Sequence, residues 1–337
     1  MKLLIIGGTQ FLGRHYVESA LRRGYEVTLF HRGKTNPDLY PECEHILGDR
    51  DGEIQKVGAR EWDIVVDPSG YVPRVVSQSV KHLVGKAGYY IFISSISVYP
   101  GHEPNSDESA AIAMLEEPGS EDIPKHYGAL KAECEQLVLE YFPTNSQIVR
   151  AGMIVGPHDK INRFNYWLRR ISEGGEVLAP GSPEAPLQLI DARDIAEWSL
   201  DLAERKIGGI FNVTGPVMPM TMGHLLETIR QELEPNAKLH WVDSDFLVAK
   251  EIGLVDGIPY WVTPDLYGFF QRKIDRALKS GLKFRPLAET VRDTWAELKA
   301  RKVPSEPGRV PLPEKLTREQ EQELLREFRT INEKSPS

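Results

Sequence analysis

The heptapeptide GGTQFLG, residues 7–13, stands between the apolar run Leu3–Ile6 and a helical pattern over Arg14–Arg23. Glycine lets the backbone turn tightly and approach a pyrophosphate, and the free N–H groups at the start of a helix attract negative charge. A second strand-like run, Glu26–Phe30, follows about 20 residues on, as a dinucleotide-binding turn requires. The heptapeptide therefore predicts a dinucleotide site formed by Gly7, Thr9, Gln10, Phe11, Leu12 and Gly13.

Gln10 departs from the usual form of this turn, because it occupies the middle glycine position of a G-x-x-G-x-x-G pattern. The turn can keep its shape with glutamine there. Its amide side chain must then point away from the phosphates or contact them.

Short strand-like runs alternate with helical patterns through the first half of the chain. The strand-like runs are Asp63–Val66, Tyr89–Ile93 and Gln147–Val149, and the helical patterns are Val75–Val84 and Ala129–Tyr141. Apolar strands separated by helices imply right-handed crossovers and a parallel sheet covered on both faces. We expect an α/β fold with a doubly wound parallel sheet (Rossmann) and a smaller, mostly C-terminal substrate domain.

The alternation stops near Pro157, which suggests how the chain is divided. We assign residues 1–157 and 187–215 to the dinucleotide-binding domain, and residues 158–186 and 216–300 to the substrate domain. Residues 301–337 combine a Pro-rich linker, Val303–Pro313, with a helix opened by the capping box Thr317-Arg-Glu-Gln320. An apolar stripe on that helix would dock on the body or, alternatively, on a partner subunit; it consists of Leu324, Leu325, Phe328 and Ile331.

Composition limits the classes of partner. A formal net charge of −8 disfavours non-specific binding to nucleic acid. Cys43 and Cys134 are too few for a disulfide framework, and no spacing of histidines, cysteines and carboxylates fits a metal site. No apolar segment approaches the roughly 18–20 residues of a membrane span. We expect a soluble cytoplasmic protein that acts on a small molecule, without metal, membrane or nucleic acid as partner.

Two basic residues, Arg32 and Lys34, follow the second strand-like run, and no acid lies between Thr28 and Asn36. A carboxylate at this point usually binds the ribose 2′-hydroxyl of NAD, whereas a 2′-phosphate prefers arginine or lysine. The pattern favours NADP over NAD. A solvated basic loop is the alternative explanation.

Three residues in order form a candidate catalytic set. Tyr127 and Lys131 have the i, i+4 spacing that puts them on one helical face, and Ser95 follows the strand-like run before them. A free tyrosine has a pKa near 10, and a nearby ammonium would move that pKa toward neutrality. Tyr127 would then shuttle a proton while Ser95 holds the reacting oxygen. Lys131 could also bind the cofactor ribose.

These features resemble the extended short-chain dehydrogenase/reductases, also called the NAD-dependent epimerase/dehydratase family, over roughly residues 1–300. The resemblance rests on GGTQFLG, GDRD at 48–51, SSISVY at 94–99, YGALK at 127–131, RAGMIVGP at 150–157 and LIDARDIA at 189–196. It implies that Asp49 and Arg50 contact the adenine and that Ser69 and Gly70 lie beside the pyrophosphate and ribose. It also implies that Ala151 and Gly152 flank the nicotinamide. A dimer is usual among such proteins.

Departures from the family pattern concern the substrate. Nucleotide-sugar members carry Asn where this chain has Gly152, Met153 and Ile154, and an arginine for the diphosphate near the position of Leu187. Their loss argues against a diphosphate sugar and leaves the cofactor site intact. One branch of the family, similar to chloroplast stem-loop-binding proteins, is closer in its basic pair and GDRD turn.

That branch makes RNA binding a second hypothesis. Arg163-Phe-Asn-Tyr-Trp-Leu-Arg169-Arg170 mixes aromatics with arginines as single-strand binders do, although an amphipathic helix with an aromatic core face gives the same pattern. Tyr71, Trp241 and Trp261 could line a substrate pocket or belong to the core. An acidic insert ahead of Tyr127 suggests a solvated loop; its carboxylates are Glu103, Asp107, Glu108, Glu116, Glu117, Glu121 and Asp122.

The sequence thus supports an NAD(P)-dependent oxidoreductase or epimerase acting at a hydroxyl or carbonyl carbon of a small, sugar-like substrate. The alternative is a dinucleotide-binding module with an RNA- or protein-binding role and little catalysis. The complete Ser95, Tyr127 and Lys131 set favours the enzyme.

Overall fold

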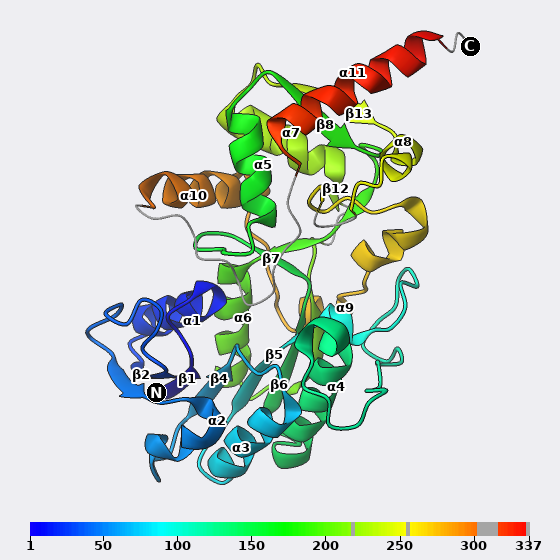
Figure 1. Cartoon of the computed structure of the whole chain (residues 1–337). Coiled ribbons are helices and arrows are strands. Elements are labelled where there is room, and N and C mark those ends of the chain that lie inside the picture. The colour runs from blue at the N-terminus through cyan, green and yellow to red at the C-terminus, as the bar shows by residue number, and fades with distance from the viewer. Residues whose placement is uncertain (217–219, 254–256, 302–315, 335–337) are drawn as a thin grey trace.

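A computed structural model describes residues 1–216, 220–253, 257–301 and 316–334 of the chain. Its centre is a seven-stranded sheet in the order β11-β6-β5-β4-β1-β2-β3, in which every neighbouring pair is parallel. Figure 1 shows this sheet in the lower half of the molecule. The strands are β1 (Lys2–Ile6), β2 (Glu26–His31), β3 (Glu44–Leu47), β4 (Ile64–Asp67), β5 (Tyr90–Ser95), β6 (Ser146–Ala151) and β11 (Gly209–Val213).

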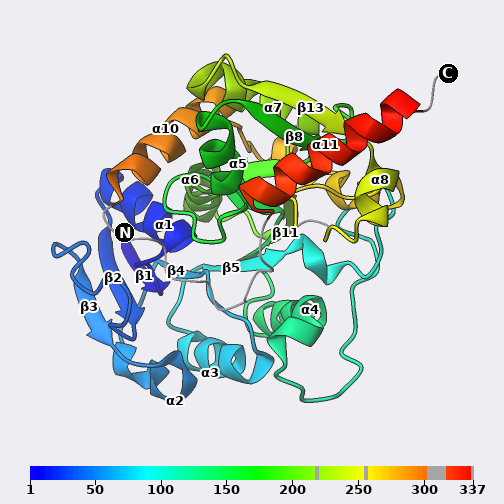
Figure 2. The same ribbon diagram turned by 45° about the horizontal axis from the view of Figure 1, so that its top comes forward.

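Helices cover both faces of the sheet, as Figure 2 shows. Helices α1 (Phe11–Arg22) and α6 (Ala192–Glu204) pack on the face that carries Leu3 and Ile5. Helices α3 (Pro73–Leu83) and α4 (Ile123–Tyr141) pack on the face that carries Leu4 and Ile6. Alternate residues of one strand thus enter two cores, which is why the strands are apolar throughout. The expected doubly wound Rossmann fold is confirmed.

Two local features differ from the expectation. Strand β3 was not foreseen, because the short edge segment Glu44–Leu47 carries few apolar residues. Helix α4 starts at Ile123, where Asp122 caps it by accepting from the Lys125 amide, but His126 breaks the helical conformation. Regular helix therefore begins at Tyr127, at the candidate catalytic residue itself.

A second hydrophobic core lies beyond the carboxyl ends of the strands (Figure 1). It joins α5 (Arg163–Ser172), α7 (Met222–Leu233) and α10 (Leu287–Ala300) to the parallel pair β8 (Glu176–Pro180) and β13 (Lys238–Val242). Shorter elements complete this part of the chain: β7 (Met153–Val155), β9 (Pro186–Leu187), β10 (Leu189–Asp191), β12 (Met220–Thr221), α8 (Ser244–Ala249) and α9 (Asp275–Lys279), with 3-10 turns at Ile54–Val57, Ile96–Val98 and Pro264–Phe270 and a short α2 at Arg50–Glu53. The domain boundaries assigned from the sequence stay a prediction.

Helix α5 corrects the RNA-binding interpretation of its sequence. Phe164 and Trp167 are fully buried in the second core, and the Trp167 indole donates to the Pro259 carbonyl at 2.9 Å. Arg170 is buried as well and donates to Glu321 at 2.7 Å. These groups are unavailable for base stacking or phosphate contact, so the amphipathic-helix interpretation is confirmed.

The C-terminal helix α11 (Arg318–Lys334) packs on the second core. Its capping box is confirmed, since Thr317 and Gln320 exchange side-chain bonds to each other's amides at 2.9 and 3.3 Å. Leu324 and Leu325 are buried, and Phe328 meets Phe246 edge to face, whereas Ile331 remains half exposed. The expected linker Val303–Pro313 lies outside the described residues. Within the described ranges no helix has the length and hydropathy needed to cross a membrane.

The buried pair of Arg170 and Glu321 predicts a large effect of one substitution. Glu321→Ala leaves the Arg170 charge buried without its carboxylate, so the free energy of unfolding should fall by about 3–5 kcal/mol. Glu323→Ala removes an exposed carboxylate of the same helix and should change it by less than about 0.5 kcal/mol. Chemical denaturation of both variants measures the difference, and equal losses would contradict the assignment.

Candidate functional site

The glycine turn has the shape of a phosphate cradle. Gly7 and Gly8 have φ angles of 126° and 100°, which favour glycine. A Cβ at Gly13 would lie 3.0 Å from the Gly8 backbone, so helix α1 starts in close contact with the turn. Each of the three glycines is therefore required by the backbone.

The N-terminus of α1 is open to a ligand. Gln10 stands at the N-cap in extended conformation, and its exposed side chain makes no capping bond. Thr9 and Leu12 are buried, and the Thr9 carbonyl accepts from the Asn36 amide at 2.9 Å. Because no side chain occupies the first-turn N–H groups, they fit the phosphates of a dinucleotide.

A second turn, after β4, lies against the first. Ser69 donates from its hydroxyl to the Ile6 carbonyl at 3.0 Å, next to Gly7. Gly70 cannot carry a side chain, because a Cβ there would approach Phe92 to 2.6 Å. The structure thus brings Ser69 and Gly70 to the crossover point of the sheet between β1 and β4, where ligands bind in open α/β folds.

The two basic residues, Arg32 and Lys34, lie in the loop after β2, at the same edge of the sheet but on the other side of β1 from Ser69 and Gly70. Arg32 is partly exposed and stands 4.0 Å from the Asp49 carboxylate, which comes from the end of β3. An acid thus approaches Arg32 from a neighbouring strand, although the sequence around Arg32 contains none. Lys34 lies in the same loop after β2.

The Arg50 guanidinium is held by side chains of β4 and α3. It donates to both Asp67 oxygens at 2.6 and 2.7 Å and to the Ser79 hydroxyl at 2.9 Å. Burial alone would raise the pKa of Asp67, but Arg50 outweighs it and holds that pKa below its usual value. Arg50 therefore fixes the end of β4, and the adenine contact that the resemblance implied stays a prediction.

Ser95, Tyr127 and Lys131 gather at the ends of β5 and α4. Ser95 is the last residue of β5, and its hydroxyl accepts from the Ser97 amide at 3.1 Å. Lys131 is buried and donates to the carbonyls of Gly70 and Ile93 at 2.5 and 2.6 Å. The lysine thus joins the turn after β4 to the end of β5.

Burial dominates the acid–base state of both groups. It raises the pKa of Tyr127, and the nearby Tyr71 adds to this, whereas Ser95 and the Arg163 charge act in the opposite direction. Burial lowers the pKa of Lys131 to about 8. In the structure, Ser95 and Arg163 are therefore the groups that favour a Tyr127 phenolate, and the expected effect of Lys131 on this pKa is not among its causes.

Ala151 and Gly152 close the site at the end of β6. Ala151 pairs with Ser95 across the sheet, and the Gly152 amide donates to the Val213 carbonyl at 3.0 Å. A Cβ at Gly152 would lie 2.2 Å from the Thr214 hydroxyl, so only glycine fits.

Sequence analysis missed a glycine that sets the position of α4. A Cβ at Gly128 would lie 2.0 Å from the Ser97 carbonyl oxygen, so the helix touches the turn that follows Ser95. Glycine between a tyrosine and a lysine at helical spacing was the available signal.

Of the three aromatic residues offered as pocket or core candidates, Tyr71 lies beside the site, with its ring centroid 6.4 Å from that of Tyr127. Trp261 is buried in the second core, and Trp241 lies on β13.

The acidic insert is only partly a solvated loop. Glu103, Glu116 and Glu117 are exposed, as expected. Glu108 is buried, and its carboxylate accepts from the Asn212 amide at 2.8 Å. The expectation for Glu108 was wrong because its partner lies on β11, far along the sequence.

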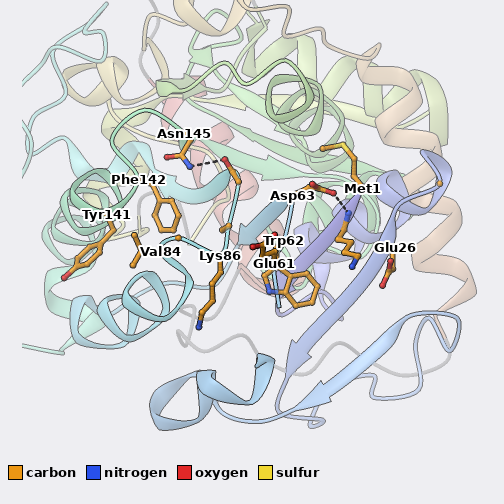
Figure 3. Close-up of a pocket in the computed structure, with 15 residues that line it drawn as sticks. Met1, Glu26, Glu61, Trp62, Asp63, Val84, Lys86, Tyr141, Phe142 and Asn145 are labelled. Carbon is orange, nitrogen blue, oxygen red and sulfur yellow. Dashed lines mark hydrogen bonds between the residues drawn. The ribbon is translucent and has the colours of Figure 1, made fainter. Parts of the chain in front are cut away.

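A surface hollow of about 920 Å³ lies at the other edge of the sheet, around the amino ends of β1 and β2 (Figure 3). It is lined by Met1, Lys2, Gly24, Glu26, Glu61, Trp62, Asp63, Val84, Gly85, Lys86, Ala87, Gly88, Tyr141, Phe142 and Asn145. None of the candidate site residues is among them. The hollow is therefore separate from the edge that carries Tyr127.

The chain belongs to the NAD-dependent epimerase/dehydratase family, whose model matches residues 3–214. This confirms the family resemblance drawn from the sequence. The match ends one residue after β11 and covers every predicted site residue.

Individual relatives agree with this assignment. A chloroplast stem-loop binding protein of 41 kDa from Arabidopsis thaliana is 27% identical over 232 residues, which cover 64% of this chain and 58% of that protein. The Bordetella bronchiseptica enzyme WbmH, solved with NAD⁺, superposes with a TM-score of 0.66 at 18% identity over 90% of this chain and 99% of that one. A UDP-N-acetylglucosamine 4-epimerase from Methanobrevibacter ruminantium gives 0.66 at 21% identity, over 89% and 98%. At these identities the solved structures establish the fold.

The contact at Gly128 predicts that a single methyl group disturbs the site. Gly128→Ala must push α4 away from the Ser97 carbonyl, so the free energy of unfolding should fall by about 1–3 kcal/mol. Gln136→Ala adds helix propensity on the exposed face of α4 and should not destabilise the protein. Thermal unfolding of both variants checks this, and an unchanged Gly128→Ala would refute the close contact.

Proposed function

We propose that the chain is an NAD(P)-dependent oxidoreductase or epimerase that acts at a hydroxyl or carbonyl carbon of a small, sugar-like molecule. The observation that carries the proposal is that Ser95, Tyr127 and Lys131 gather at the ends of β5 and α4, at the sheet edge that also bears the glycine turn. Membership of the NAD-dependent epimerase/dehydratase family supports it independently.

The dinucleotide would lie across the carboxyl edge of the sheet. Its pyrophosphate would meet the first-turn amides of α1 and residues 7–13, with Ser69 and Gly70 beside it. The adenosine would extend over β2 and β3 toward Arg32, Lys34 and Asp49. Ala151 and Gly152 would flank the nicotinamide over β6. The order of the strands supports this direction, because β1 separates the two halves.

In this proposal the bound nicotinamide supplies the hydride acceptor and donor. Ser95 donates a hydrogen bond to the substrate oxygen and fixes its position. Tyr127 accepts the hydroxyl proton when the alcohol is oxidised and returns it when the carbonyl is reduced. Lys131 would orient the adjacent ribose, while its bonds to Gly70 and Ile93 keep its charge within the site.

We infer that the substrate carries no nucleoside diphosphate. Leu187 is buried and pairs with Met220 where nucleotide-sugar members place an arginine. Arg272 lies close to this strand in space, because its backbone amide donates to Gln188. Its guanidinium, however, donates to the Gly101 carbonyl at 2.6 Å and to the Ser106 hydroxyl. A panel of free and phosphorylated sugars, tested against UDP-sugars, examines this inference directly.

The role of Tyr127 gives the first functional test. Tyr127→Phe removes the proton shuttle and should lower kcat about 10²- to 10⁴-fold while leaving the dinucleotide Kd unchanged. Tyr141→Phe, at the other end of the same helix, is the control and should keep full activity. Turnover is followed by NAD(P)H absorbance with a substrate found by screening. Full activity of Tyr127→Phe would exclude this mechanism.

The pair of Arg32 and Asp49 gives a test of dinucleotide choice. We propose that a 2′-phosphate draws Arg32 away from Asp49, so NADP binds more tightly than NAD. Arg32→Ala should weaken NADPH by about tenfold to hundredfold, as expected for a lost charge-assisted bond, and NADH by less than about threefold. Fluorescence titration measures both, with Arg22→Ala on α1 as the control. Equal losses for the two dinucleotides would count against a 2′-phosphate contact.

A further inference from the structure

Two histidines lie side by side on the neighbouring strands β2 and β3, and the proposed function uses neither. His31 is the last residue of β2, and His45 lies on β3. The His31 Nε2 atom is 2.8 Å from the His45 Nδ1 atom, and the ring planes are nearly perpendicular at 79°. His31 is buried, directly before the loop that carries Arg32 and Lys34.

The hydrogen bonds around the pair fix the position of every ring proton. The Gly33 amide donates to His31 Nδ1 at 3.1 Å, so that nitrogen carries no proton. His31 must therefore hold its proton on Nε2 and donate it to His45 Nδ1. His45 in turn holds its proton on Nε2 and donates it to the Tyr40 carbonyl at 3.0 Å. Both rings are neutral, and all four ring nitrogens are occupied.

An additional proton on either ring breaks this chain. Protonated His31 would turn an N–H toward the Gly33 amide, and protonated His45 would turn one toward His31 Nε2. Each case replaces a hydrogen bond by two donors facing each other. Burial lowers the pKa of His31, and a positive charge on His45 would lower it further, which agrees with a neutral His31 ring.

The relay is connected to the phosphate turn. Gly33 and Tyr40 lie at the two sides of the loop that follows β2, and Asn36 within it donates to the Thr9 carbonyl. The Tyr40 hydroxyl also donates to Glu18 of α1 at 2.6 Å. Losing the bond at Gly33 or Tyr40 would thus release the loop from the edge where the adenosine ribose is expected.

Other titratable groups around the pair are engaged elsewhere. On α1, Arg14 and Glu18 meet the Tyr40 hydroxyl, and Glu18 also contacts His15. Arg32 faces Asp49 at the outer end of the loop. Glu44 precedes His45 but points to the other face of the sheet, where it binds Thr28 and Arg60. Cys43 is buried, and burial raises its pKa to about 11, so it stays neutral near pH 7.

We propose that His31 and His45 form a neutral relay that holds the loop after β2 in its binding shape, so that acidification from pH 8 to pH 5.5 weakens dinucleotide binding. The pair acts by positioning the loop and touches no reacting atom. This inference rests on the proposed dinucleotide site. Its sign follows from linkage: the folded, binding-competent form excludes a proton that free histidine takes up near pH 6.5, so affinity is complete above that pH and falls below it.

The experiment measures the Kd of NAD⁺ by calorimetry between pH 5.5 and 8. NAD⁺ is the probe because it lacks a 2′-phosphate, a group whose own second pKa lies near 6. For the wild type, Kd should rise about fivefold to tenfold on acidification to pH 5.5. A glutamine pair, His31→Gln with His45→Gln, can accept and donate in the same order without titrating. It should bind within about threefold of the wild type at pH 8 and show a flat profile.

Two controls separate the relay from general stability. A leucine pair, His31→Leu with His45→Leu, should bind at least about tenfold more weakly at every pH, because it loses the bonds to Gly33 and Tyr40. His82→Gln on α3 removes a histidine from the other face of the sheet and should keep the wild-type profile. A flat wild-type profile, or a glutamine pair as pH-sensitive as the wild type, would overturn the relay.

A measurement without variants tests the same arrangement. Nitrogen NMR of ¹⁵N-histidine-labelled protein at pH 8 should find both rings neutral with the proton on Nε2; a charged ring or the other tautomer would overturn the inference. Binding with a flat profile would refute the relay alone. Absence of NAD⁺ binding at every pH would refute the proposed function and the pH effect together.

Discussion

The buried ammonium of Lys131 is the interaction on which the arrangement of the site depends. It reaches from α4 to the Gly70 carbonyl after β4 and to the Ile93 carbonyl within β5. Burying an isolated ammonium in this position would be unfavourable in free energy. The two carbonyls and the Phe92 ring, whose centroid lies 4.1 Å from Nζ, offset this cost. The same three elements carry Ser69, Ser95 and Tyr127, so the lysine fixes their relative positions. The charge of Lys131 is therefore needed to hold the site together, apart from any part it has in the chemistry.

A different set of bonds holds the second core to the sheet above this edge. Asp191 caps α6 and accepts from the Thr290 hydroxyl of α10 at 2.8 Å. Arg285, just before α10, donates to Asp194 of α6 at 2.7 Å and adds a second link between these parts of the chain. On the other side His15 of α1 bonds to the Pro157 carbonyl at 2.9 Å. Because these contacts flank the glycine turn, they set how closely the second core approaches a ligand on the sheet.

Local sequence was sufficient for the central strands of the sheet and for the glycine turn, because both depend on neighbouring residues. Apolar runs predicted five central strands, and GGTQFLG predicted the turn before α1. What local sequence could not supply was the pairing of distant residues. The pairing of Arg50 with Asp67 was not foreseen, and Glu108 was expected in solvent but binds β11. The histidine relay likewise depends on the register of β3 against β2, and β3 itself was not foreseen.

The pKa shifts of Tyr127 and Lys131 indicate that the protein alone does not turn Tyr127 into a base. Burial raises the pKa of the phenol and lowers that of the ammonium to about 8, so each shift favours the uncharged form. A phenolate at neutral pH therefore needs a positive charge near Tyr127 in addition to the effects of Ser95 and Arg163. An oxidised nicotinamide over Ala151 and Gly152 would bring such a charge, and a reduced one would not. The protonation state of Tyr127 would then follow the redox state of the cofactor, with a base available for oxidation and an acid for reduction.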